Sequence, residues 1–236
     1  MRSGPGSAHR VRALLFDMDG TLVNSIAVVE RTWRRFAARH GLDADEILAA
    51  CHGRRAAETV ALFARPGLDV DAETGRLTAE EIADIDGVVA IRGAAELLSA
   101  LPAGSWAIVT SAGRELAMTR LTATGLIVPE VLVTAEDVAD GKPAPDGYLA
   151  AARALGVAPA DCMVFEDAPA GLQAGRAAGA AVVAVAGAHP PHSSVSGSGP
   201  EGWIGDRIED YNAVEVAAQP DGSLLVRIAP PTMRHL

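Results

Sequence analysis

The feature that most constrains the fold is a regular alternation of short apolar runs with helical segments in the second half of the chain. Apolar runs occupy residues 106–109, 131–134, 162–165 and 181–185. The spacing of apolar residues predicts helices over 94–101, 114–124, 147–155 and 171–178. Strands that alternate with helices in this way pair in parallel, because each helix carries the chain back across the sheet. We therefore predict an α/β fold with a doubly wound parallel sheet.

One more apolar run, at 13–16, lies near the start of the chain and ends in Asp17 and Asp19. Ligands of open parallel sheets bind beyond the carboxyl ends of the strands. If the run stays extended, both carboxylates project to the same side of the chain. Two neighbouring carboxylates repel each other, so such a pair is stable when a cation lies between them or when one carboxyl is protonated. A polar turn after an ordinary strand is the alternative interpretation.

Between this run and the alternating region, the sequence predicts only helices. Apolar residues recur at helical spacing after residue 25, and further helical stretches cover 45–50, 56–64 and 78–85. We expect residues 25–91 to form a helical domain that is inserted into a core domain. The core domain would then consist of residues 10–24 and 92–230.

The end of the chain contains a loop and a hairpin signal. Residues 187–202 are rich in Pro, Gly, Ser and His. The G-x-G-x-x-G pattern at 197–202 does not lie between a strand and a helix, so we reject it as a dinucleotide site. Apolar runs at 214–218 and 224–228 flank a Pro-Asp-Gly turn. This arrangement predicts a hairpin, which we expect to add edge strands to the sheet.

The composition limits the possible partners. The 236 residues carry a formal net charge of -10, which disfavours nucleic acids and anionic membranes, because both attract positive surfaces. Two cysteines, Cys51 and Cys162, are too few and too far apart for a disulfide scaffold or a zinc site. We expect a cytoplasmic protein, a monomer or weak homodimer, that acts on a small molecule.

Polar residues gather where the predicted strands end. The groups are Asp17 with Asp19, Thr110 with Ser111, Glu166 with Asp167, and Lys142 in a Gly-Lys-Pro segment. Lys142 is the only lysine among the 20 basic residues, the others being arginine. Four carboxylates against one ammonium need a hard cation, and oxygen ligands suit Mg²⁺. The residues therefore point to metal-assisted phosphoryl transfer, with Lys142 and hydroxyl and N–H donors holding the phosphoryl group.

These segments resemble the four motifs of the haloacid dehalogenase-like hydrolase superfamily, which has a Rossmann-like core. The resemblance covers residues 11–186, and the helical insert resembles the small helical cap of one subgroup. Within the superfamily, the chain is similar to the sugar-phosphate, 2-deoxyglucose-6-phosphate and glycerol-3-phosphate phosphatases. The segments that carry this similarity are His52-Gly53-Arg54, Ala107 to Ser111, and Phe165 to Gly171.

The resemblance implies a role for each motif residue. Asp17 would attack phosphorus and form an aspartyl-phosphate, and Asp19 would act as general acid and then as general base. Mg²⁺ would be held by the Asp17 carboxylate, the Asp19 carbonyl oxygen and Asp167, with Glu166 nearby. The phosphoryl oxygens would be bound by three further residues, Thr110, Ser111 and Lys142. The expected function is a Mg²⁺-dependent phosphatase that acts on a small phosphorylated sugar or polyol.

Differences from the family patterns bear on the alternatives. A dehalogenase lacks the second acid, which is present here as Asp19, and a phosphonate hydrolase needs a cap lysine, which is absent. Phosphosugar mutases resemble this chain but carry Val and His where Thr21 and Val29 stand, so a mutase is the second choice. A non-enzymatic binding protein on the same fold is the third.

The core motifs bind phosphate and metal, so the choice of substrate must come from the insert. We expect its densest polar group to contact substrate hydroxyls: His52, Arg54, Arg55 and Glu58. Gly53 interrupts the helical pattern there and would let the loop approach the core. The alternative is that the two arginines pair with nearby acids on a solvated helix end.

Overall fold

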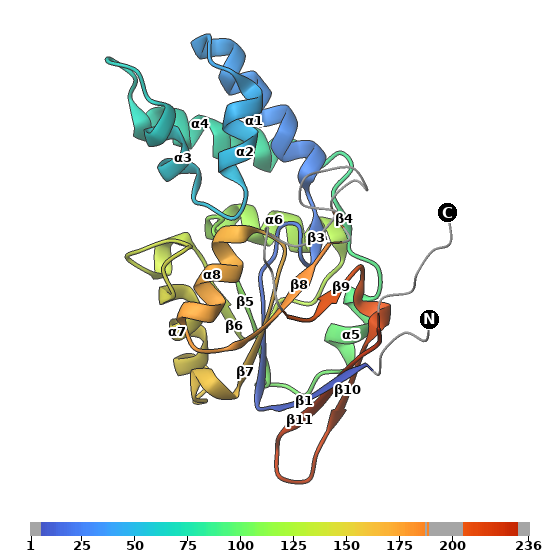
Figure 1. Ribbon diagram of the computed structural model, residues 1–236. Helices are drawn as coiled ribbons and strands as arrows, with labels where there is room; N and C mark the ends of the chain where they lie inside the picture. Colours follow the sequence, from blue (N-terminus) through green and yellow to red (C-terminus); the bar gives the residue numbers. More distant parts are fainter. Residues whose placement is uncertain (1–5, 187, 189–204, 231–236) are drawn as a thin grey trace.

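The computed structural model describes residues 6–186, 188 and 205–230, and its centre is a six-stranded parallel sheet (Figure 1). The strand order is β6-β5-β2-β7-β8-β9. The strands are β2 (Ala13–Phe16), β5 (Trp106–Val109), β6 (Val131–Val133), β7 (Cys162–Glu166), β8 (Ala181–Val185) and β9 (Arg207–Ile208). The predicted α/β fold with a doubly wound parallel sheet is confirmed.

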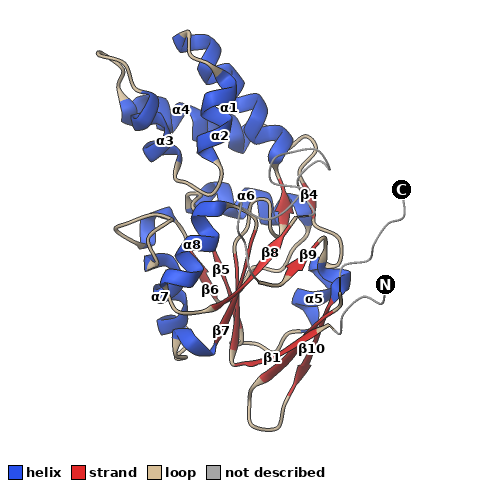
Figure 2. Cartoon of the chain, in the orientation of Figure 1, coloured by secondary structure: helices blue, strands red, loops and turns tan. Residues whose placement is uncertain are grey.

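Helices cover both faces of this sheet (Figure 2). They are α5 (Ala94–Ala100), α6 (Arg114–Thr124), α7 (Asp146–Ala154) and α8 (Pro169–Ala177). Successive side chains of β2 point to opposite faces, and all four are buried. Ala13 and Leu15 pack in a cluster with residues of α7 and α8, whereas Leu14 and Phe16 pack in a cluster with residues of α5 and α6. Burial on both faces explains why these strands read as unbroken apolar runs.

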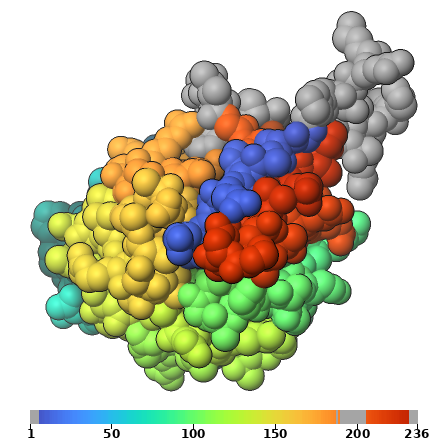
Figure 3. Space-filling model, turned by 90° about the horizontal axis from the view of Figure 1, so that it is seen from below, coloured from blue at the N-terminus to red at the C-terminus, as the bar shows by residue number. Residues whose placement is uncertain are grey.

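The expected place of the C-terminal hairpin is wrong. Its strands β10 (Val214–Ala218) and β11 (Leu224–Ile228) do not extend the parallel sheet. They form a separate antiparallel sheet, in which β11 also pairs with the N-terminal strand β1 (Ser7–Val11). Figure 3 shows the blue N-terminal segment against the red hairpin. The two edge strands of the parallel sheet are β6 and β9 instead.

The reason for this arrangement is that β11 has an apolar face that needs a partner. Leu224, Val226 and Ile228 alternate with more exposed residues and are buried. They belong to the same apolar cluster as the α5 and α6 face of the parallel sheet. The small sheet therefore closes the core on this side, which an edge position could not do.

The insert forms a group of helices beyond the carboxyl ends of the strands (Figure 1). They are α1 (Ile26–His40), α2 (Ala44–Cys51), α3 (Ala56–Phe63) and α4 (Val70–Ala83), and they share a core of their own around Trp33 and Phe36. Two short antiparallel strands, β3 (Val23–Asn24) and β4 (Val89–Ala90), pair where the chain enters and leaves the insert.

One helix of the insert is longer than the sequence predicts. The pattern indicates a helix over 78–85, but α4 begins at Val70. The Asp69 side chain accepts a hydrogen bond from the Ala72 N–H and so caps a first turn that has few apolar residues. Three short 3₁₀ turns complete the described structure, at Ala135–Asp137, Pro159–Asp161 and Tyr211–Ala213.

The glycine pattern at 197–202 lies outside the described residues. None of the helices in the described part of the chain has the length and apolarity that membrane crossing requires.

Candidate active site

The ends of β2 and β7 bring a lysine and two carboxylates into direct contact. Lys142 lies in the loop before α7, and its Nζ donates to Asp17 Oδ1 at 2.5 Å and to Glu166 Oε1 at 2.6 Å. The carbonyl oxygen of Val109, at the end of β5, accepts the third hydrogen bond at 3.2 Å. All three donor positions of the ammonium are thus used, and the group is 5 % exposed.

Glu166 is fixed from several sides. Besides Lys142, the Tyr148 hydroxyl donates to Glu166 Oε1 at 3.1 Å, and the Ala168 N–H donates to Oε2 at 3.0 Å. Both carboxylate oxygens therefore have partners within the protein. Such a carboxylate is suited to holding Lys142 in place beside Asp17.

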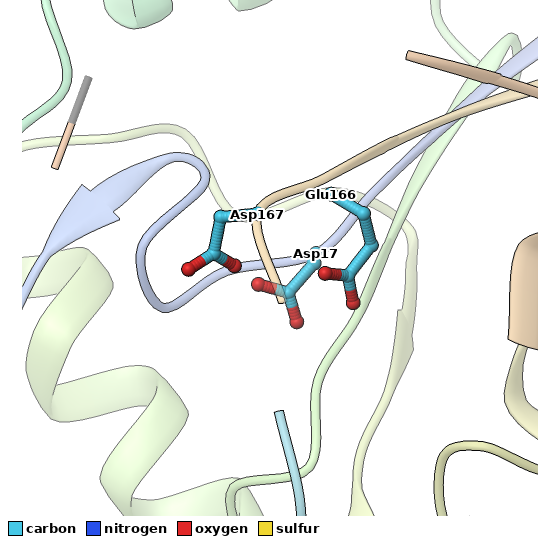
Figure 4. A group of neighbouring side chains, drawn as sticks. All are labelled: Asp17, Glu166 and Asp167. Atoms are coloured by element: carbon cyan, nitrogen blue, oxygen red, sulfur yellow. The ribbon is translucent and has the colours of Figure 1, made fainter. Parts of the chain in front are cut away.

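Three carboxylates meet in one space at the end of the sheet. One ligand oxygen each from Asp17, Glu166 and Asp167 lies within 4.8 Å of the others (Figure 4). Thr21 Oγ1 donates to Asp167 Oδ1 at 3.2 Å. Gly20 has φ of +85°, and a Cβ there would lie 2.0 Å from Asp167 Oδ2, so only glycine allows this turn.

Burial and crowding change the ionisation of these groups. Burial of the Asp17 carboxyl raises its pKa well above the ordinary value; Lys142 opposes this, and Glu166 and Asp167 add to it. Burial likewise raises the pKa of Glu166. For Lys142, burial opposes the charge, but Asp17 and Glu166 outweigh burial and raise the pKa of the ammonium. The excess negative charge fits a divalent cation with oxygen ligands, as Mg²⁺ requires.

Asp19 lies apart from this cluster and has different partners. The Ser25 hydroxyl donates to Asp19 Oδ1 at 2.7 Å, and Arg120 Nη1 of α6 lies 2.7 Å from Oδ2. Arg120 Nη2 in turn lies 3.4 Å from Glu81 Oε2 of α4. Burial of the Glu81 carboxyl raises its pKa, which Arg120 opposes and Asp19 reinforces.

A cavity of about 420 Å³ separates the insert from the sheet. Five of the predicted core residues line it, namely Asp17, Asp19, Thr110, Ser111 and Asp167. Lys142 and Glu166 lie behind Asp17 and do not form part of the wall. Of the predicted cap residues, His52, Arg54 and Arg55 line the cavity, whereas Glu58 lies outside it, next to Arg55.

The loop between α2 and α3 contacts the core directly. Arg55 donates to the carbonyl oxygens of Val138 and Ala139, each at 2.8 Å. The Ser111 hydroxyl donates to the carbonyl oxygen of Gly53 at 2.9 Å. These hydrogen bonds hold the loop against the core domain. The sequence indicated this approach only through Gly53, which interrupts the helical pattern.

Four residues in these contacts were not predicted from the sequence: Ser25, Glu81, Arg120 and Tyr148. Arg120 gave a usable signal, because it lies at helical spacing among Leu116, Ala117 and Leu121, which are all buried. A charged residue on a buried helical face usually has a buried partner. The identity of that partner depends on how α4 meets α6, and the sequence does not show this.

Comparisons with known proteins agree with this geometry. The family model described as haloacid dehalogenase-like hydrolase matches residues 11–179. Hexitol phosphatase A of Escherichia coli (strain K12) is 41% identical over 92% of this chain and 100% of its own length. The 2-deoxyglucose-6-phosphate phosphatase 2 of Saccharomyces cerevisiae is 33% identical over 93% of this chain and 96% of its own.

A crystal structure of a hydrolase from Pseudomonas syringae has a similar fold. Its TM-score is 0.67 at 26% sequence identity, and the match covers 84% of this chain and 92% of that one.

Proposed function

Since the chain belongs to the haloacid dehalogenase-like hydrolase family and is a phosphoric monoester hydrolase, we propose that it is a Mg²⁺-dependent phosphatase for small phosphorylated polyols or sugars. The observation that carries the proposal is the buried contact of Lys142 with Asp17 and Glu166, beside Asp167. We place the core domain at residues 10–24 and 92–230, and the cap domain at 25–91.

The first half of the reaction uses Asp17 and Asp19. Asp17 attacks phosphorus and forms an aspartyl-phosphate, which divides one difficult displacement into two steps. Thr110 and the Ser111 N–H bind phosphoryl oxygens. Lys142 was expected to join them, but its three donors are used within the protein, so we assign it to orienting the Asp17 carboxylate instead. Asp19 donates a proton to the leaving alkoxide, and the Ser25 and Arg120 contacts hold its carboxyl at the cavity wall.

In the second half, Asp19 takes a proton from a water molecule that attacks the aspartyl-phosphate. Inorganic phosphate leaves and Asp17 is regenerated. The hydrogen bonds of the cap loop to Val138, Ala139 and Ser111 keep bulk water out until the leaving alcohol has departed.

Asp17, Asp167 and the Asp19 carbonyl oxygen would hold Mg²⁺, with Glu166 next to them. When bound, the ion neutralises negative charge on the phosphoryl oxygens. The donor set fits, because three carboxylates converge there and Lys142 is shared by Asp17 and Glu166.

The cap loop is proposed to choose the substrate through His52 and Arg54, which line the cavity, whereas Glu58 lies outside it, next to Arg55. The guanidinium of Arg55 donates to core carbonyl oxygens, so we assign it to holding the loop closed. Arg55→Ala should therefore lower the turnover of both esters. Substrate choice is tested by Arg54→Ala, with a sugar phosphate and p-nitrophenyl phosphate compared. Loss with the sugar phosphate alone supports substrate choice by the loop; equal losses, or none, would refute it.

The proposed function itself is tested by phosphate release from phosphorylated polyols, sugars, nucleotides and amino acids, with Mg²⁺ and with chelator. We expect release from polyol or sugar phosphates that chelator abolishes. Turnover that is equal in chelator, or confined to nucleotides, would contradict the proposal.

A phosphosugar mutase is less well supported, because Val29 lines the cavity and has no group that transfers protons. A binding protein without activity is disfavoured, because every catalytic motif residue is present. A cytoplasmic location and a monomeric or weakly dimeric state stay predictions.

A further inference from the structure

One face of α4 carries a polar stripe that is turned toward the cavity. Thr74, Thr78 and Glu81 are spaced by four and three residues, so they lie on the same side of the helix, and all three line the cavity. Core-facing stripes of helices are usually apolar. The opposite wall, on α1, is apolar and includes Val29 and Trp33. Among the cap helices, the cavity wall is therefore polar along α4, apart from Leu77, and apolar along α1.

The polar side continues across the domain boundary to α6, which packs against α4 (Figure 1). Arg120 is 3 % exposed and links Asp19 of the core to Glu81 of the cap. Its Nε has no hydrogen-bond partner among the described residues, and neither has Thr74 Oγ1. Both atoms are buried at the cavity wall, and leaving such groups unpaired is costly. Both belong to residues that line the cavity, so unused hydrogen-bonding capacity lies directly beside it.

The position of this stripe relative to Asp19 indicates which part of a substrate would reach it. If the ester oxygen lies beside Asp19, the carbon chain of the leaving alcohol extends away from Asp17, along Arg120 toward Glu81. The wall offers donors on Arg120 and an acceptor on Glu81. A hydroxyl group both donates and accepts, so it matches this mixture. A second phosphate would be repelled by Glu81, and a hydrocarbon chain would leave the polar atoms unpaired.

We propose that Glu81, Arg120 and Thr74 form a subsite that binds hydroxyl groups of the leaving alcohol, several atoms away from the phosphate. This inference rests on the proposed phosphatase function. It assigns recognition of the polyol chain to the contact between α4 and α6, in addition to the α2–α3 loop.

The test compares two esters with chains of equal length, glucitol 6-phosphate and hexyl phosphate, on the full-length enzyme with Mg²⁺. The variants are Glu81→Gln and Thr74→Val, which keep the side-chain shape. Glu80→Gln is the matched control, because Glu80 lies next in sequence on α4 and pairs with Arg35 and Arg39 instead. Arg120 is left unchanged, since its loss would also disturb Asp19.

We expect the wild type to favour glucitol 6-phosphate in kcat/KM by at least about 100-fold, because a site built for hydroxyls rejects analogues without them. Glu81→Gln should lower this preference by about 10- to 100-fold, the scale of a hydrogen bond to a charged group. Thr74→Val should lower it about 3- to 10-fold, and Glu80→Gln should keep it.

Two kinds of result would overturn the proposal of this subsite. One is equal turnover of both esters by the wild type, and the other is an unchanged preference in both variants. In either case, Mg²⁺-dependent release of phosphate leaves the proposed phosphatase standing. If the wild type hydrolyses no phosphomonoester at all, the proposed function fails and the subsite fails with it.

Discussion

Lys142 shows how much a single residue determines at this site. Its ammonium donates to two carboxylates and one carbonyl oxygen, all within 3.2 Å. A point charge with tetrahedral donors satisfies these three partners, whereas a planar guanidinium cannot. The sequence already pointed to this residue, because every other basic side chain is arginine.

We predict that Lys142→Arg loses most of its activity although it keeps the charge. The larger group should displace Asp17 and cost about 2–4 kcal/mol of transition-state stabilisation, the scale of a preorganised donor. The measurement is kcat with a saturating phosphate ester. Arg153→Lys, on the following helix α7, is the control and should behave as wild type. A Lys142→Arg enzyme with wild-type kcat would show that the ammonium geometry is unimportant.

A second prediction concerns Cys51, which lies at the end of α2 and lines the cavity. Burial raises the pKa of its thiol to about 12, and Glu81 adds to the effect. The folded state thus keeps the proton that an unfolded chain loses at about pH 8.5. The resulting stabilisation is complete below that pH and is lost as the pH rises toward 12.

Alkylation by iodoacetamide checks this, because only the thiolate reacts. In the native enzyme, the rate at Cys51 should still be rising at pH 10, whereas in urea it should level off about one unit above the ordinary thiol pKa of about 8.5. The same plateau in both states would contradict a raised pKa.

At the scale of elements, the sequence predicted five of the six strands of the parallel sheet, because strands buried on both faces appear as apolar runs. The sixth strand, β9, was missed, because it is only two residues long. The strand β1 was missed, because Ser7–Val11 alternates in exposure and has no apolar run. The place of the hairpin was wrong for a related reason. Its position depends on pairing with β1 more than 200 residues away, and no local pattern reports such a contact.

The loop between α2 and α3 makes its core contact through Gly53. This residue has φ of +74°, and a Cβ there would lie 2.7 Å from the Ala168 Cβ. We predict that Gly53→Ala lifts the loop from the core and lowers kcat/KM at least tenfold. Gly67→Ala is the control in the same domain, because Gly67 also has positive φ, at +93°, but a Cβ there would meet no described atom within 4 Å.

Both substitutions should lower stability by about 1–2 kcal/mol, the cost of the left-handed conformation. Only Gly53→Ala should also lower kcat/KM, measured at a temperature at which both variants are folded. Equal activities of the two variants would mean that the close contact of the loop with Ala168 is not needed for turnover.

The small antiparallel sheet should contribute to global stability. Leu224 on β11 is 1 % exposed and belongs to the main apolar cluster. Leu224→Ala should therefore lower the free energy of unfolding by about 2–5 kcal/mol, as in other buried leucine truncations. Arg227→Ala on the same strand is exposed and should stay within about 0.5 kcal/mol of wild type. Urea unfolding measures both, and a small effect at Leu224 would show that the hairpin is a dispensable extension.

At the scale of the whole molecule, the site is made by two parts of the chain that meet over a cavity. The core supplies Asp17, Lys142, Glu166 and Asp167. The sequence located the carboxylates because they lie at strand ends, and Lys142 because it is the only lysine of the chain. The cap supplies Glu81 and the loop around Gly53. The link between Arg120 and Glu81 could not be predicted, because it exists only once α4 packs against α6.

In the proposed mechanism, Asp17 carries the phosphoryl group during turnover. The most direct measurement is rapid acid quenching of the enzyme with a polyol phosphate and Mg²⁺, followed by mass mapping of the peptide that contains residue 17. We predict one phosphoryl group on Asp17 in the wild type. Asp17→Asn should fold normally, carry no phosphoryl group and be inactive. Full activity of Asp17→Asn, or steady turnover by the wild type with no phosphoryl group on residue 17 at any quench time, would contradict the account.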